Sequence, residues 1–101
     1  MNFKVKVEIS TGLLICHIVN SHDKIMLTLK GNGEKSVELV PEMEYRIEYF
    51  YWSATATKYS IDANFDTEIS GFDSIHLEDE TDGPYQSQPE HYYFTTPANP
   101  F

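Results

Sequence analysis

The chain has 101 residues, of which 41% are hydrophobic and 14% aromatic, and it carries a formal net charge of −9. This composition excludes wholesale disorder and predicts a single globular domain. Because phosphate groups and anionic lipids attract basic proteins, the acidic balance argues against nucleic acid and against anionic membranes as partners. With Cys16 as the single cysteine, no intrachain disulfide can form.

The first residues, MNFKVKVEIS, lack the apolar stretch of a signal peptide. The longest apolar run, residues 13–19, is too short to cross a bilayer. We therefore expect a protein without membrane insertion that is cytoplasmic, or that is released without a classical signal peptide.

Alternation of apolar and polar residues dominates the first half of the chain, and this pattern predicts β-strands. Residues 3–9 alternate strictly and are expected to form a half-buried strand with a charged outer face. A break at Thr11-Gly12 precedes a nearly continuous apolar strand over residues 13–19. Residues 25–30 alternate again, and Gly31-Asn32-Gly33 follows as a turn of the kind that hairpins use.

The second half continues the same pattern with shorter and weaker segments. The longest strand is expected over residues 43–52, and a loop of small residues follows it at 53–56. Residues 78–88 are acidic and contain Gly83-Pro84, which predicts an exposed loop. The other expected strands are residues 36–40, 57–66, 75–77 and 92–95.

Seven or eight short strands, with a turn about every ten residues, predict an all-β fold. We expect a single antiparallel β-sandwich over residues 1–95, immunoglobulin-like or jelly-roll-like, followed by a short tail at 96–101. A small β-barrel is the alternative.

The strand at 43–52 is unusual because its two faces differ. Tyr45, Ile47, Tyr49 and Tyr51 share one face, which is the natural core face. The opposite face begins charged and ends with two aromatic residues. We expect a binding site at this aromatic end and its neighbouring loops, formed by Phe50, Trp52, Arg46 and Tyr85. The alternative is that Phe50 and Trp52 are covered by the 53–56 loop.

The acidic residues concentrate in the second half, where residues 51–101 carry nine acids against Lys58 alone, a net charge of −8. One stretch, D-x-N-x-D-x-E, resembles the start of an EF-hand calcium loop and would supply oxygen ligands. Thr67 stands where that loop needs glycine, and strand alternation explains the same oxygens as a solvent face. A second acidic cluster follows at 78–83. The candidate calcium ligands are Asp62, Asn64, Asp66, Glu68, Asp73, Asp79 and Asp82.

No sequence motif for catalysis is present, and Cys16 and His17 should point to opposite faces of one strand. We therefore expect a small acidic, non-catalytic binding module without a required cofactor, whose partner is a protein or a carbohydrate ligand. One alternative is a calcium-assisted carbohydrate- or lipid-binding module. Another is a structural subunit of a homo-oligomeric assembly.

Overall fold

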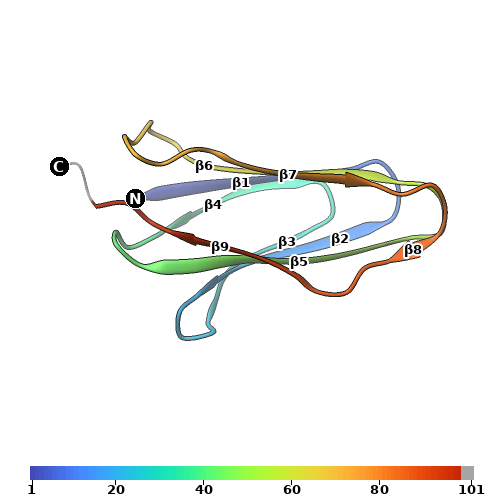
Figure 1. Cartoon of the computed structure of the whole chain (residues 1–101), viewed down its shortest axis with the longest axis horizontal. Coiled ribbons are helices and arrows are strands. Elements are labelled where there is room, and N and C mark those ends of the chain that lie inside the picture. Colours follow the sequence, from blue (N-terminus) through green and yellow to red (C-terminus); the bar gives the residue numbers. More distant parts are fainter. Residues whose placement is uncertain (99–101) are drawn as a thin grey trace.

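The computed structural model describes residues 1–98 and consists of nine β-strands, with no helix in this part of the chain (Figure 1). No segment of these residues forms a helix that could cross a membrane. The strands are β1 (Asn2–Ile9), β2 (Leu13–Asn20), β3 (Ile25–Lys30), β4 (Gly33–Glu38), β5 (Glu44–Ser53), β6 (Lys58–Phe65), β7 (Ile75–Glu80), β8 (Tyr85–Gln86) and β9 (Glu90–Thr95).

The strands form two antiparallel sheets that pack face to face, so the predicted all-β sandwich is confirmed. The first sheet has the order β4-β1-β6-β7. The second has the order β3-β2-β5-β8, with β9 also paired to β5. The expected seven or eight strands become nine because the short strand β8 lies inside the predicted 78–88 loop. The expected strand at 75–77 is also longer, since β7 extends to Glu80.

Pairs of consecutive strands connect the two sheets, and each pair forms one long, bent ribbon. β1 runs into β2, β3 into β4, and β5 into β6, and each of these ribbons passes from one sheet to the other. β7 likewise leads to β8 in the opposite sheet. The bends lie at residues 10–12, 31–32, 54–57 and 81–84, together at one end of the molecule (Figure 1). We call this end the bend end and the opposite one the open end.

The Gly31-Asn32-Gly33 turn connects different strands from those of a simple hairpin. A turn is present, and Gly31 has a φ of +77°, which glycine adopts at little cost. However, the turn joins β3 in one sheet to β4 in the other, so it closes no hairpin within a sheet. The expected strand at 36–40 is accordingly displaced, and β4 covers Gly33–Glu38.

The core lies between the sheets and is built by the alternating apolar residues. Phe3, Val5 and Val7 of β1 are at most 1% exposed, and Ile47 of β5 and Ile61 of β6 are fully buried. Each such side chain stabilises the fold by about 1.5–3 kcal/mol relative to its exposed state. The same alternation leaves every second residue of these strands on an outer face.

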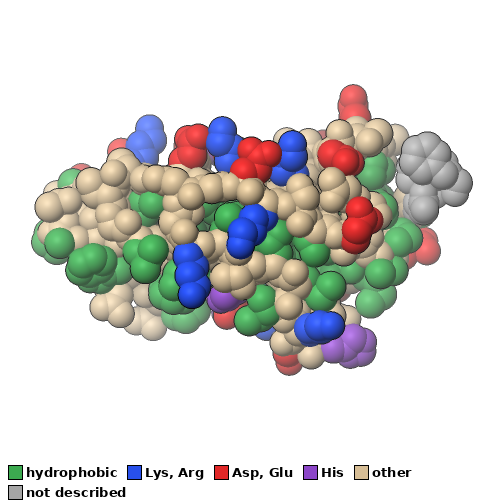
Figure 2. Space-filling model, turned by 180° about the vertical axis from the view of Figure 1, so that it is seen from behind, with side chains coloured by type: hydrophobic (Ala, Val, Ile, Leu, Met, Phe, Trp, Pro, Cys, Tyr) green, Lys and Arg blue, Asp and Glu red, His purple; other side chains and the backbone are tan. Residues whose placement is uncertain are grey.

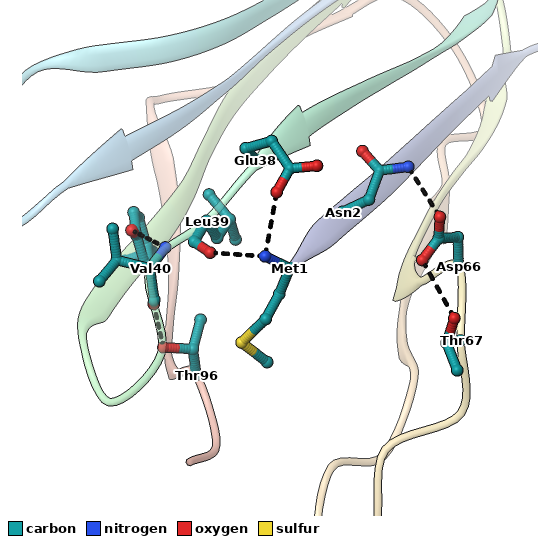
Figure 3. Close-up of polar contacts among 9 residues, drawn as sticks. Met1, Asn2, Glu38, Leu39, Val40, Asp66, Thr67 and Thr96 are labelled. Atoms are coloured by element: carbon teal, nitrogen blue, oxygen red, sulfur yellow. Dashed lines mark hydrogen bonds and ion pairs between the residues drawn. The ribbon is translucent and has the colours of Figure 1, made fainter. Parts of the chain in front are cut away.

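At the open end, Thr96 connects the chain after β9 to the segment between β4 and β5. Its hydroxyl donates to the Val40 carbonyl at 2.7 Å (Figure 3). The same hydroxyl accepts a hydrogen bond from the Met43 nitrogen at 2.9 Å. Thr96 is 2% exposed, so the packed part of the chain extends through this residue. The remainder of the expected tail at 96–101 falls partly on residues 99–101, outside the described residues.

Candidate binding site

The outer face of the five-stranded sheet carries the aromatic residues that the sequence singled out. On β5, Tyr45, Ile47 and Tyr51 point into the core, whereas Phe50 is 38% exposed and Trp52 is 51% exposed. Tyr49 was expected in the core and is only half-buried. The two faces of β5 therefore separate much as alternation predicts, and Trp52 is not covered by the 53–56 loop.

Two apolar residues of β2 extend this surface, and the sequence analysis did not single them out. Leu13 lies directly opposite Trp52, and Ile15 lies directly opposite Phe50. Leu13 is 46% exposed and Ile15 is half-buried. We call these four residues the apolar patch. In Figure 2, hydrophobic side chains gather at the lower left, where the bend end of the five-stranded sheet lies.

Glycine at position 12 fixes how β2 approaches β5 beside the apolar patch. Gly12 has a φ of +88°, and a Cβ atom there would lie 2.1 Å from the Trp52 carbonyl oxygen. Any larger residue would collide with the backbone that carries Trp52. This position is a close approach of two bends, which the Thr11-Gly12 break in the sequence signalled only as a turn.

Hydroxyl groups hold the same bends together. The Thr57 hydroxyl donates to the Thr11 carbonyl oxygen at 2.6 Å, and the hydroxyls of Thr11 and Ser53 lie 3.0 Å apart. Ser53 and Thr57 are 1% and 4% exposed, so these polar groups are satisfied inside the protein. The expected loop at 53–56 is thus a bend next to Trp52 that hydrogen bonds hold in place.

Arg46 lies on the same outer face but is occupied by ion pairs. Its Nη1 donates to Asp23 Oδ1 at 2.9 Å, and its Nε donates to Glu48 Oε2 at 3.3 Å. The hydrogen bond to Asp23 raises the pKa of Arg46, so it stays charged. His91 also lies 3.5 Å from Glu48. Arg46 therefore belongs to a polar border on the open-end side of the apolar patch.

Tyr85 does not join the other three predicted binding residues. It lies opposite Ser53 in the β5–β8 pair and stacks on the ring of Tyr51, with ring centroids 5.4 Å apart. Because Ser53 and Tyr51 are on the core face of β5, Tyr85 covers the margin of the core and not the outer face. The structure thus brings Phe50 and Trp52 together with Leu13 and Ile15, and it separates Tyr85 from them.

The acidic residues form no EF-hand. Asp62 and Asn64 lie on strand β6, on the exposed face of the four-stranded sheet. Asp66 follows the strand, and its two oxygens accept hydrogen bonds from Asn2 and Thr67 (Figure 3). Glu68, Asp73 and Asp82 lie in connections, and Asp79 lies on β7. Within residues 1–98, no group of three or more such side chains is placed to hold a metal ion.

A shallow groove of about 740 Å³ lies on the outer face of the four-stranded sheet. His76 lies in it between two carboxylates, with Nδ1 2.5 Å from Asp62 and Nε2 3.1 Å from Glu78. The hydrogen bonds to Asp62 and then to Glu78 raise the pKa of His76. His76 and these two carboxylates are therefore hydrogen-bonded to one another across the floor of the groove.

Cys16 lies fully in the core. Burial raises the pKa of its thiol to about 12, which keeps the thiol protonated and unreactive at neutral pH. His17 points to the outer face and lies 3.0 Å from the Thr28 hydroxyl. The two side chains are therefore on opposite faces of β2, as the sequence analysis expected.

Comparison with known proteins gives no relative for this chain: no family model, no curated protein and no solved structure matches it.

Proposed function

We propose that this protein is a small, acidic, non-catalytic binding module that docks a protein partner through the apolar patch. The observation that supports the proposal is the pairing of Trp52 with Leu13 and of Phe50 with Ile15 on an outer face. Three of these side chains are more than a third exposed. Aromatic residues that gain burial on binding often dominate the affinity of an interface.

The surroundings of the apolar patch also support a protein partner. The polar border at Arg46, Glu48 and Asp23 resembles the rim that surrounds the apolar centre of many interfaces. A carbohydrate ligand is the second kind of partner, because sugar rings stack on exposed tryptophan. The protein partner and the carbohydrate ligand can be distinguished by whether Leu13, whose side chain offers no hydrogen bond, contributes to affinity.

The experiment compares three variants in one retention assay on an extract of the source cells. Trp52→Ser and Leu13→Ser each remove one side chain of the apolar patch. Lys4→Ser removes a side chain of similar exposure on the opposite outer face. A partner retained by the wild type should bind at least about tenfold more weakly to both apolar-patch variants, measured afterwards by calorimetry. Lys4→Ser should leave its affinity within about twofold.

Two results would count against the proposal. One is a partner that binds all three variants equally, which would place the contact elsewhere. The other is quenching of Trp52 fluorescence by neutral oligosaccharides with no loss of affinity in Leu13→Ser, which would favour the carbohydrate ligand.

A calcium-assisted carbohydrate- or lipid-binding module remains the alternative function, and a calcium titration tests it separately.

For the topology, we infer a jelly-roll-like rather than an immunoglobulin-like sandwich. The support is the set of long ribbons that bend from one sheet into the other at a single end.

A further inference from the structure

The four edges of the two sheets differ in how they are protected against pairing with another chain. An edge strand presents unpaired backbone groups, and proteins commonly shield them with charges, prolines or bulges. The edges are β4 and β7 in the four-stranded sheet, and β3 and β9, with β8, in the five-stranded sheet.

Two of these edges carry charges that oppose self-pairing. On β7, Glu78, Asp79 and Glu80 follow one another. On β4, Glu34 and Glu38 lie on the outer face, opposite Lys6 and Asn2 of β1. Like charges directly opposite each other across a strand pair destabilise it.

The β3 edge is covered from the neighbouring ribbon. Lys35 of β4 reaches across and donates to the Thr28 carbonyl oxygen of β3 at 2.9 Å. Lys30 ends the same strand. In Figure 2 this edge faces the viewer, and Lys and Arg side chains are spread over it.

The β9 edge lacks such protection within residues 1–98. Its sequence is EHYYFT, in which Glu90 is the only acid and stands at the first position. Tyr93 is 61% exposed and Tyr92 is 40% exposed. In the described chain, this six-residue strand pairs only with β5, so its other edge is unpaired. Pro89 and Pro97 flank the strand and limit any further pairing to this segment.

We propose that β9 pairs with β9 of a second copy of this chain, antiparallel across a two-fold axis. The even residues Tyr92 and Phe94 lie opposite core residues of β5, and the odd residues His91 and Tyr93 lie opposite its outer residues. A two-fold axis perpendicular to the sheet preserves these faces. Among the registers that keep these faces, we place the axis at Tyr93, the most exposed large residue of the strand, so that Tyr93 lies against Tyr93 of the second copy and His91 against Thr95.

The second copy fits this edge because no acidic or basic side chain of β9 then opposes a like charge. Aromatic side chains on adjacent strands stabilise a pair of this kind.

The dimer would join the two five-stranded sheets and present two apolar patches on one continuous face. The pairing itself does not depend on the proposed function. Because both copies carry a net charge of −9, salt should strengthen it.

Sedimentation velocity on the purified full chain tests the proposal, from about 1 to about 100 µM protein at low and high salt. The wild type should shift from 11.6 kDa to twice that mass as the concentration rises. Tyr93→Lys and Tyr93→Glu, each at an exposed position, should both dimerise at least about tenfold more weakly. An equimolar mixture of the two should recover the dimer, because opposite charges then meet at the axis.

Ser36→Lys, on the β4 edge, and Trp52→Lys, in the apolar patch, serve as controls that should leave the dimer intact. A wild type that stays monomeric throughout would overturn the proposal. So would a dimer that survives both Tyr93 variants, or one that dissociates in Trp52→Lys alone. If the mixture of Tyr93 variants fails to recover the dimer while both retain the wild-type circular dichroism, β9 does not pair with itself.

Discussion

The two outer faces of the sandwich are built by the same alternation and differ in chemistry. On the four-stranded sheet, outer side chains pair as ions, with Lys4 3.2 Å from Glu34 and Lys6 3.1 Å from Glu8. On the five-stranded sheet, the bend end exposes Trp52 and its apolar neighbours instead. Paired charges on the four-stranded sheet keep that face soluble. Exposed apolar side chains on the five-stranded sheet do not serve solubility, and we propose that they serve binding.

The largest effect is expected between neighbours on β5. Tyr51 is 4% exposed and Trp52 is 51% exposed, so Tyr51→Ala should lower the free energy of unfolding by about 3–5 kcal/mol. Trp52→Ala should lower it by about 1 kcal/mol or less. Urea unfolding followed by circular dichroism measures both. Equal losses would show that β5 is buried on both faces and would remove the contrast between the sheets.

A second prediction concerns the glycine beside the apolar patch. Gly12→Ala should destabilise the protein by more than about 2 kcal/mol, because the new Cβ would overlap the Trp52 carbonyl as well as strain the backbone. Gly71→Ala is the matched control: its φ is +85°, and nothing lies within 4 Å of the added atom. It should cost only about 1–2 kcal/mol. If thermal melts give the two variants the same loss, close approach does not position Trp52.

A third prediction tests the charged face through pH. The folded-state pKa of His76 is raised by Asp62 and Glu78, so its stabilising effect is present below its ordinary pKa and is lost as pH rises through the raised value. The melting-temperature difference between wild type and His76→Gln should therefore shrink between about pH 5 and about pH 9. A difference that grows with pH would mean that His76 acts in another way.

The smallest expected effect is that of calcium. If Asp62, Asn64, Asp66 and Glu68 serve only as a strand face and its continuation, about 5 mM calcium should leave the melting temperature unchanged, because a ligand must bind the folded state to raise it. A clear rise that Asp66→Ala abolishes would support a calcium site there. A rise abolished instead by Asp79→Ala or Asp82→Ala would assign calcium to the second acidic cluster.

Much of the sandwich was predictable because strict alternation reports burial directly. The alternating segments at residues 3–9 and 57–66 became β1 and β6, and their apolar residues form the core. What alternation cannot show is which sheet a strand joins. The Gly31-Asn32 turn has the composition of a hairpin turn, yet it crosses between sheets, because the direction of a connection depends on packing beyond the turn.

The candidate site was only half predictable for a related reason. Trp52 and Phe50 stand out in the sequence, but Leu13 and Ile15 belong to an apolar run that gives no sign of which face is exposed. Their position beside Trp52 and Phe50 follows from the β2–β5 register, a long-range property. The position of Tyr85 away from them could not be predicted, because a two-residue strand is too short for alternation to show which face a residue occupies.

The proposed binding site requires an exposed Trp52, and Trp52 is the only tryptophan in the chain. Its fluorescence in a dilute solution of the wild type therefore tests this exposure most directly. We predict emission near that of free indole, strong quenching by acrylamide, and a blue shift when a partner binds. Blue emission that is protected from acrylamide in the isolated protein, and that no partner changes, would contradict it.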